Sequence, residues 1–243
     1  MKNDTLIVIP VRMNSFRFPG KPLIDINGRA MIYHVWKRAI LSKCGEVIVA
    51  CCDKEVKEYL VEKDIPHVMT KKKLFSGTDR VYNAMQILLN NNHYKYIINL
   101  QGDIPDVSPS SIKKLVSIIK LKEVQMATLV SKIRDTKAIK DKNIVKVVLS
   151  EHGKFYRGLY FSRSPVPYGA SEFYEHIGIY AYKLNTLKRF ISLKESELEK
   201  IESLEQLRAL EDGIQIIVGK VNKAPYSIDS PKDLKKFLKK SNK

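Results

Sequence analysis

Short apolar runs alternate with longer segments of helical spacing through the first half of the chain. Uninterrupted apolar runs are typical of buried strands, and apolar residues three or four positions apart are typical of helices that pack on a sheet. Their regular alternation predicts an α/β fold with a mostly parallel sheet. The expected strands are 6–9, 47–51, 66–69 and 96–100, and the expected helices are 31–40, 54–63, 78–89 and 109–121.

The second half of the chain has a less regular pattern. Basic or irregular stretches separate its apolar runs, which predicts a sheet extended by an insertion. Ser230 is a favourable N-cap for a last helix that begins at Pro231. No internal repeat or long linker is present, so we expect a single domain over residues 1–243. The expected strands are 126–130, 145–149, 160–163, 178–181 and 214–218, and the expected helices are 184–191, 204–210 and 231–238.

The loop that follows the first expected strand carries three cations. Arg12, Arg17 and Lys21 lie close together in sequence, and Gly20 allows a bend at which the backbone can approach a ligand. Ligands bind at the carboxyl ends of strands in open α/β sheets, and fixed charges there are unfavourable unless an anion neutralises them. The loop therefore favours a polyphosphate ligand, with a solvated basic loop as the alternative.

Three other places combine polar groups that a fold does not require. Residues 76–80 read SGTDR and open a helix, so their backbone N–H groups suit a phosphate or a base edge, or form an ordinary helix cap. Asp103 follows an apolar strand, where a carboxylate suits Mg²⁺ beside phosphates or simply ends a turn. Asp229 precedes the last helix, and its role stays open without a partner.

The composition indicates a globular protein, with 44% hydrophobic residues. The longest apolar runs, such as residues 6–11, are too short to span a membrane. A secretory h-region is missing because Lys2, Asn3 and Asp4 lead directly into that short run. We therefore expect a cytoplasmic protein without a membrane partner.

The formal net charge of +17 favours anionic ligands by long-range attraction. Lysines make up most of the cations and are dispersed along the whole chain, whereas nucleic-acid readers concentrate arginine and aromatic residues in a stripe. No RNP, zinc-finger or KH-type pattern accompanies the charge. We expect weak adventitious binding of nucleic acid and no dedicated nucleic-acid partner.

Several common kinds of site are excluded by spacing. Cys44, Cys51 and Cys52 include no CxxC pair and predict reduced thiols. The five histidines show no i, i+4 pair and no HExxH motif, and no GxSxG motif appears. Ser15 and Pro22 break the Walker A pattern in the basic loop. Oxygen-ligated Mg²⁺ remains as the expected cofactor.

Eight motifs, taken in order, resemble the bacterial 3-deoxy-manno-octulosonate (Kdo) cytidylyltransferases, also called CMP-Kdo synthetases. They extend from about Thr5 to Leu238 and read VRMNSFRFPGKPL, SGTDR, NLQGDIP, NIVKVVL, YFSR, HIGIYAY, LEQLR and IDSPKDL. The resemblance implies a Rossmann-like α/β/α nucleotidyltransferase sheet over residues 1–243, with a smaller dimerisation and sugar-binding subdomain at about 131–200. It also implies transfer of CMP from CTP to the anomeric hydroxyl of Kdo, release of pyrophosphate, use of Mg²⁺, a homodimer, and a role in lipopolysaccharide precursor synthesis.

The resemblance also assigns site residues. It implies catalytic roles for Arg12, Lys21 and Asp103, and metal ligation by Asp103 and Asp229. The nucleotide-binding residues that it implies are Arg12, Arg17, Lys21, Ser76, Gly77 and Arg80, and the sugar-binding residues are Gln101, Arg163, His176, Tyr180, Glu205 and Gln206. For the sugar-binding set the alternatives are strand packing by the histidine and tyrosine, and a solvated helix face for the last two.

Three departures from the family pattern leave other functions open. Ile104 replaces the acidic residue of the usual QGDEP motif, Cys51 and Cys52 stand in the family's ATDD motif, and Leu74 replaces a common histidine. The first alternative is a cytidylyltransferase for a related acidic sugar, such as an amino-Kdo or a sialic-like acid. The others are a basic nucleic-acid-binding protein and a relative that has kept the fold and lost activity.

Overall fold

The computed structural model describes residues 4–14, 17–88 and 94–241 of the chain. Lys2, Asn3, Ser15 and the predicted helix end at Leu89 lie outside these ranges. The chain forms two units. The first unit comprises Met1–Lys113 and Pro225–Lys243, and the second unit comprises Lys114–Ala224.

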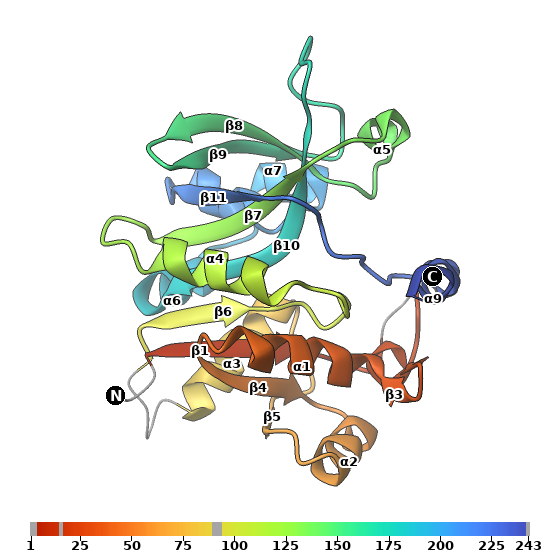
Figure 1. Ribbon diagram of the computed structural model, residues 1–243. Helices are drawn as coiled ribbons and strands as arrows, with labels where there is room; N and C mark the ends of the chain where they lie inside the picture. Colours follow the sequence, from red (N-terminus) through yellow and green to blue (C-terminus); the bar gives the residue numbers. More distant parts are fainter. Residues whose placement is uncertain (1–3, 15–16, 89–93, 242–243) are drawn as a thin grey trace. The chain divides into compact units, whose positions relative to one another are not determined.

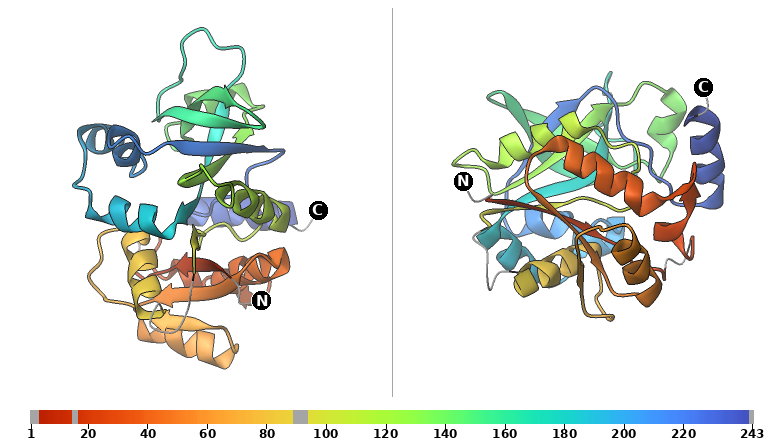
Figure 2. Two further views of the ribbon diagram at one scale, coloured as in Figure 1. Left: turned by 90° about the vertical axis from the view of Figure 1, so that its left-hand side faces the viewer. Right: turned by 60° about the horizontal axis from the view of Figure 1, so that its bottom comes forward.

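The first unit contains a parallel sheet in the strand order β5-β4-β1-β6. Its central strand β1 is completely buried, as its uninterrupted apolar sequence predicts. Helices α1 and α3 cover opposite faces of the sheet (Figures 1 and 2). The α/β class is therefore confirmed. The strands are β1 (Thr5–Pro10), β4 (Glu46–Cys51), β5 (His67–Met69) and β6 (Tyr96–Asn99).

Helices and a small hairpin complete the first unit. A turn at Asn27 and Gly28 joins the two strands of the hairpin, and both residues have positive φ. The hairpin strands are β2 (Asp25–Ile26) and β3 (Arg29–Ala30), and the helices are η1 (Lys21–Leu23), α1 (Met31–Ser42), α2 (Lys54–Glu62), α3 (Gly77–Leu88), α4 (Pro109–Ile119), which continues into the second unit, and α9 (Pro231–Ser241).

The last segment of the chain packs back onto the first unit. Ile228 is completely buried against Ile26 and Met31, and the apolar face of α9 covers this cluster with Leu234, Phe237 and Leu238. Ser230 caps α9 as predicted, since its hydroxyl accepts a hydrogen bond from the backbone N–H of Asp233 at 3.3 Å. These contacts fix the segment that carries Asp229.

The second unit contains a mixed sheet in the strand order β10-β7-β11-β9-β8. The β7–β11 pair is parallel, and the pairs β10–β7, β11–β9 and β8–β9 are antiparallel. Its strands are β7 (Met126–Lys132), β8 (Lys146–His152), β9 (Phe155–Ser162), β10 (Tyr174–Lys183) and β11 (Ile216–Val221), and its helices are α5 (Thr136–Lys140), α6 (Leu184–Ser192), α7 (Glu197–Glu202) and α8 (Leu207–Glu211).

One predicted helix, 204–210, is wrong in its bounds. Its helical part begins only at Leu207, in α8, and the preceding helix α7 was not predicted; α7 ends at Ser203, which has a left-handed φ of 52°. Helix α5 was not predicted. Within the described part of the chain, no helix has both the length and the apolar character needed to cross a bilayer.

Candidate functional site

The loop after β1 is held in place at both of its ends. The backbone N–H of Met13 donates to the Asp53 carboxylate at 2.8 Å, and the N–H of Gly20 donates to the Met13 carbonyl at 3.0 Å. Gly20 has a φ of 75°, a left-handed conformation that glycine adopts without strain, and it caps the short helix η1. This turn places Lys21 at the carboxyl edge of the parallel sheet.

The loop after β6 lies against the end of β1. A Cβ atom at Gly102 would lie 2.6 Å from Val11 Cγ1 and 3.2 Å from the Pro10 carbonyl oxygen, so only glycine allows this close approach. Just before it, the side chain of Gln101 donates to Asn99 at 3.1 Å. The loop consequently brings Asp103 to the edge where Lys21 lies.

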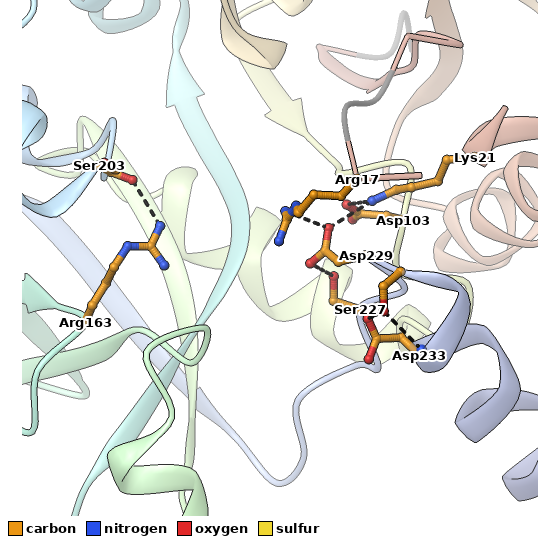
Figure 3. Close-up of polar contacts among 9 residues, drawn as sticks. Arg17, Lys21, Asp103, Arg163, Ser203, Ser227, Asp229 and Asp233 are labelled. Carbon is orange, nitrogen blue, oxygen red and sulfur yellow. Dashed lines mark hydrogen bonds and ion pairs between the residues drawn. The ribbon is translucent and has the colours of Figure 1, made fainter. Parts of the chain in front are cut away.

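Asp103 and Asp229 share one lysine (Figure 3). The Lys21 Nζ lies 2.8 Å from Asp103 Oδ2 and 3.0 Å from Asp229 Oδ1, and Arg17 donates to the same Asp229 oxygen at 3.1 Å. The side chain of Lys21 is only 14% exposed, so solvent screens its two ion pairs less than it screens that of Arg17. Asp229 therefore has the partner that its sequence position left open.

The groups around Asp229 lower the pKa of its carboxyl. Burial alone would raise the pKa of its carboxyl, but the nearby Lys21 and Arg17 charges and a hydrogen bond from Ser227 outweigh it, so the pKa is lowered. Asp229 is thus a carboxylate at neutral pH. Its oxygens and those of Asp103 are the hard ligands that Mg²⁺ takes beside phosphate groups.

The start of α3 lines the same cavity as Lys21, Asp103 and Asp229. Ser76 and Asp79 form a reciprocal cap, because the Ser76 N–H donates to the Asp79 carboxylate at 2.9 Å and the Asp79 N–H donates to the Ser76 hydroxyl at 3.0 Å. Gly77 follows without a side chain at the exposed helix N-terminus, whose positive dipole end favours anions. Arg80 is 2% exposed and donates to the Thr70 hydroxyl, which fixes its guanidinium below this turn.

A single cavity of about 240 Å³ joins these groups. Its volume is several times the ~30 Å³ that one water molecule occupies in the liquid, so it has room for a ligand group. It is lined by all nine residues of the first unit for which the sequence predicted a role, namely Arg12, Arg17, Lys21, Ser76, Gly77, Arg80, Gln101, Asp103 and Asp229. The structure brings these residues together from four separate parts of the sequence.

The predicted sugar-binding residues of the second unit include two side chains with unused polar atoms. Tyr180 and Gln206 are buried, and neither the Tyr180 hydroxyl nor Gln206 Nε2 has a hydrogen-bond partner among the described residues. Burial, with added repulsion from Tyr182 and Glu205, raises the pKa of Tyr180 well above its ordinary value. The alternative of a solvated helix face is thus wrong for Gln206.

His176 is packed between aromatic rings on β10. Its ring centroid lies 5.2 Å from those of both Phe161 and Tyr180, and Nε2 lies 3.0 Å from the Thr128 hydroxyl. Desolvation lowers the pKa of His176 to about 3, so the imidazole is neutral at physiological pH. It can position a ligand by hydrogen bonding, and it cannot supply positive charge.

Arg163 contacts backbone carbonyls. Its guanidinium donates to the carbonyl oxygens of Glu202 at 2.8 Å, Lys142 at 3.0 Å and Ser203 at 3.2 Å. The Ser203 contact is drawn in Figure 3. Arg163 therefore fastens the end of β9 to the turn that precedes Glu205 and Gln206.

Sequence reasoning did not assign roles to several residues that support the site. Asn99 links α3 to Gln101, because its amide donates to Thr78 at 3.2 Å and its oxygen accepts from Gln101. Asp53 holds the basic loop, and Asp106 accepts a hydrogen bond from Tyr226 at 2.7 Å. Of the supporting groups, only the Ser76 and Asp79 cap has a recognisable signature, the S-x-x-D pattern before a helix.

A parallel α/β unit with a basic loop, a helix N-terminus and paired carboxylates at the carboxyl edge of its sheet defines a nucleotidyltransferase of the α/β class. Comparison with known proteins narrows this class. A sequence profile described as cytidylyltransferase matches residues 6–216. With 42% identity to one curated relative over 95% of both chains, the protein belongs to the family of 3-deoxy-manno-octulosonate cytidylyltransferases.

The relatives cover the full chain. The one just cited is from Paramagnetospirillum magneticum, and a second with the same name, from Rickettsia prowazekii, is 41% identical over 100% of this chain and 99% of its own. A solved structure of CMP:2-keto-3-deoxy-manno-octonic acid synthetase complexed with CTP is 36% identical, covers 98% of both chains and gives a TM-score of 0.91. A nucleotidyl transferase from Methanothermobacter thermautotrophicus, 15% identical over 98% of this chain and 97% of its own with a TM-score of 0.62, shows the fold alone.

Proposed function

We propose that this protein transfers CMP from CTP to the anomeric hydroxyl of Kdo and releases pyrophosphate in a Mg²⁺-dependent reaction. The observation that carries the proposal is the cluster in which Lys21 contacts both Asp103 and Asp229 inside the cavity of the first unit. Cations and metal-ligating carboxylates in one cavity are what the transfer of a nucleotidyl group requires. The product would supply an activated acidic sugar for lipopolysaccharide precursor synthesis.

The triphosphate of CTP would lie along the basic loop. Lys21, Arg12 and Arg17 can neutralise its charge, and the backbone N–H of Gly77 at the start of α3 can donate to a phosphate oxygen. Arg80 adds a buried positive charge next to this helix start. The loop before Lys21 and the start of α3 are held by the hydrogen bonds described above, so little backbone reorganisation is needed there when charge develops on the departing pyrophosphate.

Asp103 and Asp229 are the residues that would hold Mg²⁺. Their carboxylates face a common point, because Lys21 contacts one oxygen of each. Two carboxylates together with substrate phosphates are a sufficient ligand set for this ion. When bound, Mg²⁺ supplies positive charge beside the α-phosphate and the attacking hydroxyl.

The protein's own residues would then direct an in-line attack on the α-phosphorus. Lys21 and Arg12 stabilise the negative charge that develops on the phosphates, and the nucleotide turn at Ser76 and Gly77 fixes the phosphate chain. The attacking hydroxyl loses its proton as its bond to phosphorus forms, and pyrophosphate leaves on the opposite side. Among the described residues, no side chain identifies itself as the general base.

Side chains of the second unit would bind the acidic sugar. The buried Tyr180 hydroxyl and Gln206 amide can hydrogen-bond sugar hydroxyls, because their polar atoms have no partner among the described residues. His176 is neutral and can accept or donate one hydrogen bond. Glu205 and Arg163 complete the proposed set, the latter through the turn that it holds.

We further propose a cytoplasmic homodimer, as expected for a user of cytosolic CTP. Exposed apolar side chains of the second unit, including Leu159 at 46% and Ile201 at 69% exposure, are candidates for the contact between subunits. Light scattering of the purified protein after size exclusion tests the dimer, and a monomeric mass at micromolar concentration would contradict it.

A pyrophosphate-release assay tests the proposed reaction. The protein is incubated with Mg²⁺, each of the four ribonucleoside triphosphates, and a panel of acidic sugars that includes Kdo, an amino-Kdo and a sialic acid. Release with CTP and Kdo confirms the proposal, and release with CTP and another acidic sugar favours the closest alternative. No release with any pair would contradict an enzymatic function and would favour either a relative that has lost activity or a nucleic-acid-binding protein. The second of these predicts metal-independent binding of nucleic acid that weakens steeply with salt.

A further inference from the structure

A second carboxylate lies in the loop that carries Asp103. Residues 101–108 read QGDIPDVS, so Asp103 and Asp106 are the acidic residues of this loop, and Ile104 between them is buried. Asp106 accepts a hydrogen bond from the backbone N–H of Tyr226, at 2.7 Å between Oδ1 and N. A hydrogen bond to an ionised carboxylate is about twice as strong as one between neutral groups.

A second contact joins the same two segments. The backbone N–H of Ile228 donates to the Asp103 carbonyl oxygen at 3.0 Å. Because Ile228 is completely buried against Ile26 and Met31, this residue cannot shift without opening the apolar cluster. The segment that ends in Asp229 is thus attached to the loop that carries Asp103 at two points, one through the Asp106 side chain and one through the backbone.

These two hydrogen bonds set the distance between the backbone positions of Asp103 and Asp229. Asp103 and Asp229 repel each other, and the ion pairs with Lys21 and Arg17 are formed by long side chains that can move. In contrast, the contacts at Tyr226 and Ile228 act on the backbone. They fix the Cα of Asp229 relative to that of Asp103 whichever way the cations point.

We propose that Asp106 is a positioning residue that holds Asp229 opposite Asp103 in the arrangement that a divalent cation requires. The inference rests on the metal site of the proposed function and assigns to Asp106 a role in the affinity of that site. Residues that orient metal ligands from outside typically change metal affinity by 10- to 100-fold when they are removed.

Three variants and two controls test this role. Asp106→Ala and Asp106→Leu remove the acceptor, whereas Asp106→Asn removes the charge and keeps an oxygen that can accept the Tyr226 N–H. Asp135→Ala is the matched control, because Asp135 also accepts a backbone N–H, from Lys137 at 2.9 Å, but lies in the second unit. Asp229→Asn is the positive control for loss of a ligand.

The readout is Mn²⁺ binding, followed by electron paramagnetic resonance with CTP present and sugar absent. We expect the Mn²⁺ dissociation constant to rise about tenfold in Asp106→Ala and Asp106→Leu and to stay within about twofold of the wild type in Asp106→Asn and Asp135→Ala. We also expect the KM for metal to rise in the first two variants while the KM for sugar is unchanged. If Asp106→Ala does not fold, the leucine and asparagine variants still provide the comparison.

Two results would overturn the inference. Unchanged Mn²⁺ affinity in Asp106→Ala would show that the backbone hydrogen bond at Ile228 is enough to hold Asp229 in place. Equal weakening of Mn²⁺ binding in Asp106→Asn and Asp106→Ala would show that the charge of Asp106, and not its hydrogen bond to Tyr226, supports metal binding. The outcome is separable from that of the proposed function. A wild-type protein that binds Mn²⁺ but releases no pyrophosphate with any sugar refutes the function alone, and an active wild type with an unaffected Asp106→Ala variant refutes the role of Asp106 alone.

Discussion

Lys21 and Asp229 are 208 residues apart in sequence, and their Nζ and Oδ1 atoms lie 3.0 Å apart in the structure. The same ammonium group contacts Asp103 at 2.8 Å, so one lysine offsets the repulsion between two carboxylates. A phosphate chain entering the cavity would compete with both carboxylates for this lysine. Lys21 therefore links nucleotide binding to the electrostatic state of the paired carboxylates.

Replacing Lys21 by methionine keeps the length of the side chain and removes its charge. We expect turnover to fall by about 10²-fold or more, because a positioned donor to the developing charge is lost. We also expect the pKa of Asp229 to rise, since the Lys21 charge is a main cause of its lowered value. Pyrophosphate release measures the first effect, and carboxyl ¹³C NMR titration measures the second.

Lys54→Met is the matched control for this substitution. Lys54 is exposed and pairs with Glu58 across one helical turn at 3.4 Å, an arrangement that contributes little to stability. Its removal should leave turnover unchanged. Turnover of Lys21→Met within threefold of the wild type would contradict the role assigned to the lysine.

Gly102 should not tolerate a side chain. In Gly102→Ala the new Cβ would lie 2.6 Å from the β-branched Val11, so the loop after β6 must move away from β1. We expect a loss of about 1–3 kcal/mol in the free energy of unfolding, together with a higher KM for metal because Asp103 moves with the loop. Urea denaturation and metal titration measure these effects. Gly178→Ala is the control, since a Cβ there has no neighbour within 4 Å, and equal effects of the two changes would contradict the explanation.

The neutral His176 makes stability depend on pH. Its pKa is about 3 in the folded chain, whereas that of an unfolded chain is about 6.5, so between these values the unfolded state binds a proton that the folded state does not. The free energy of unfolding should therefore decrease as pH falls below about 6.5, by roughly 2 kcal/mol from this residue at pH 5. Urea denaturation at pH 7.5 and 5 measures this difference in the wild type and in His176→Asn.

The asparagine variant should lose this part of the pH dependence. His152→Asn serves as the control, because His152 is an exposed histidine of the same unit. An NMR titration that places the pKa of His176 near 6.5 would show that the ring is not desolvated as described. Both the urea denaturation and the NMR titration can be carried out without substrate.

Removal of the Arg163 guanidinium should weaken binding of the acidic sugar and leave binding of CTP unchanged. In Arg163→Met the carbonyl groups of Glu202 and Ser203 lose a charged donor, and the turn that carries Glu205 and Gln206 loosens. We expect the KM for the acidic sugar to rise by about tenfold or more, in line with the loss of one or two charge-assisted hydrogen bonds, while CTP binding is unchanged.

Arg157→Met provides the comparison for this change. Arg157 is an exposed arginine on the same strand, so its replacement alters charge without releasing the turn. Steady-state kinetics with each substrate varied in turn measures both constants. A rise in the KM for CTP with no change for the sugar would contradict the assignment of Arg163 to the second unit's site.

The parallel part of the fold was predictable because its signals are local. The uninterrupted apolar run of β1 and the helical spacing of α1 each identify a buried element without reference to the rest of the chain. The Ser230 cap was correct for the same reason. The helix predicted over 204–210 was wrong in its bounds, because Ser203 adopts a left-handed conformation although it is not a glycine, so the end of α7 has no clear signature in the sequence.

In the candidate site, several cavity-lining residues were predictable and the hydrogen bonds that support them were not. Chain-wide resemblance pointed to nine residues that line the cavity, including Asp229, whose neighbours in sequence gave no indication of its role. The supporting groups Asp53 and Asp106 were not predicted, because each acts on a backbone N–H that lies 40 or 120 residues away. A lone aspartate in a loop gives no indication of such a distant partner.

The return of the final segment to the first unit sets when the site can form during synthesis. A ribosome releases the basic loop and Asp103 early, and the whole second unit follows before Asp229 emerges. Only when α9 folds back and buries Ile228 does the second carboxylate reach its place beside Lys21. A nascent chain, or one that has lost its C-terminal segment, thus has the cations of the site without the second carboxylate. The site is complete only after the C-terminal segment has packed onto the first unit.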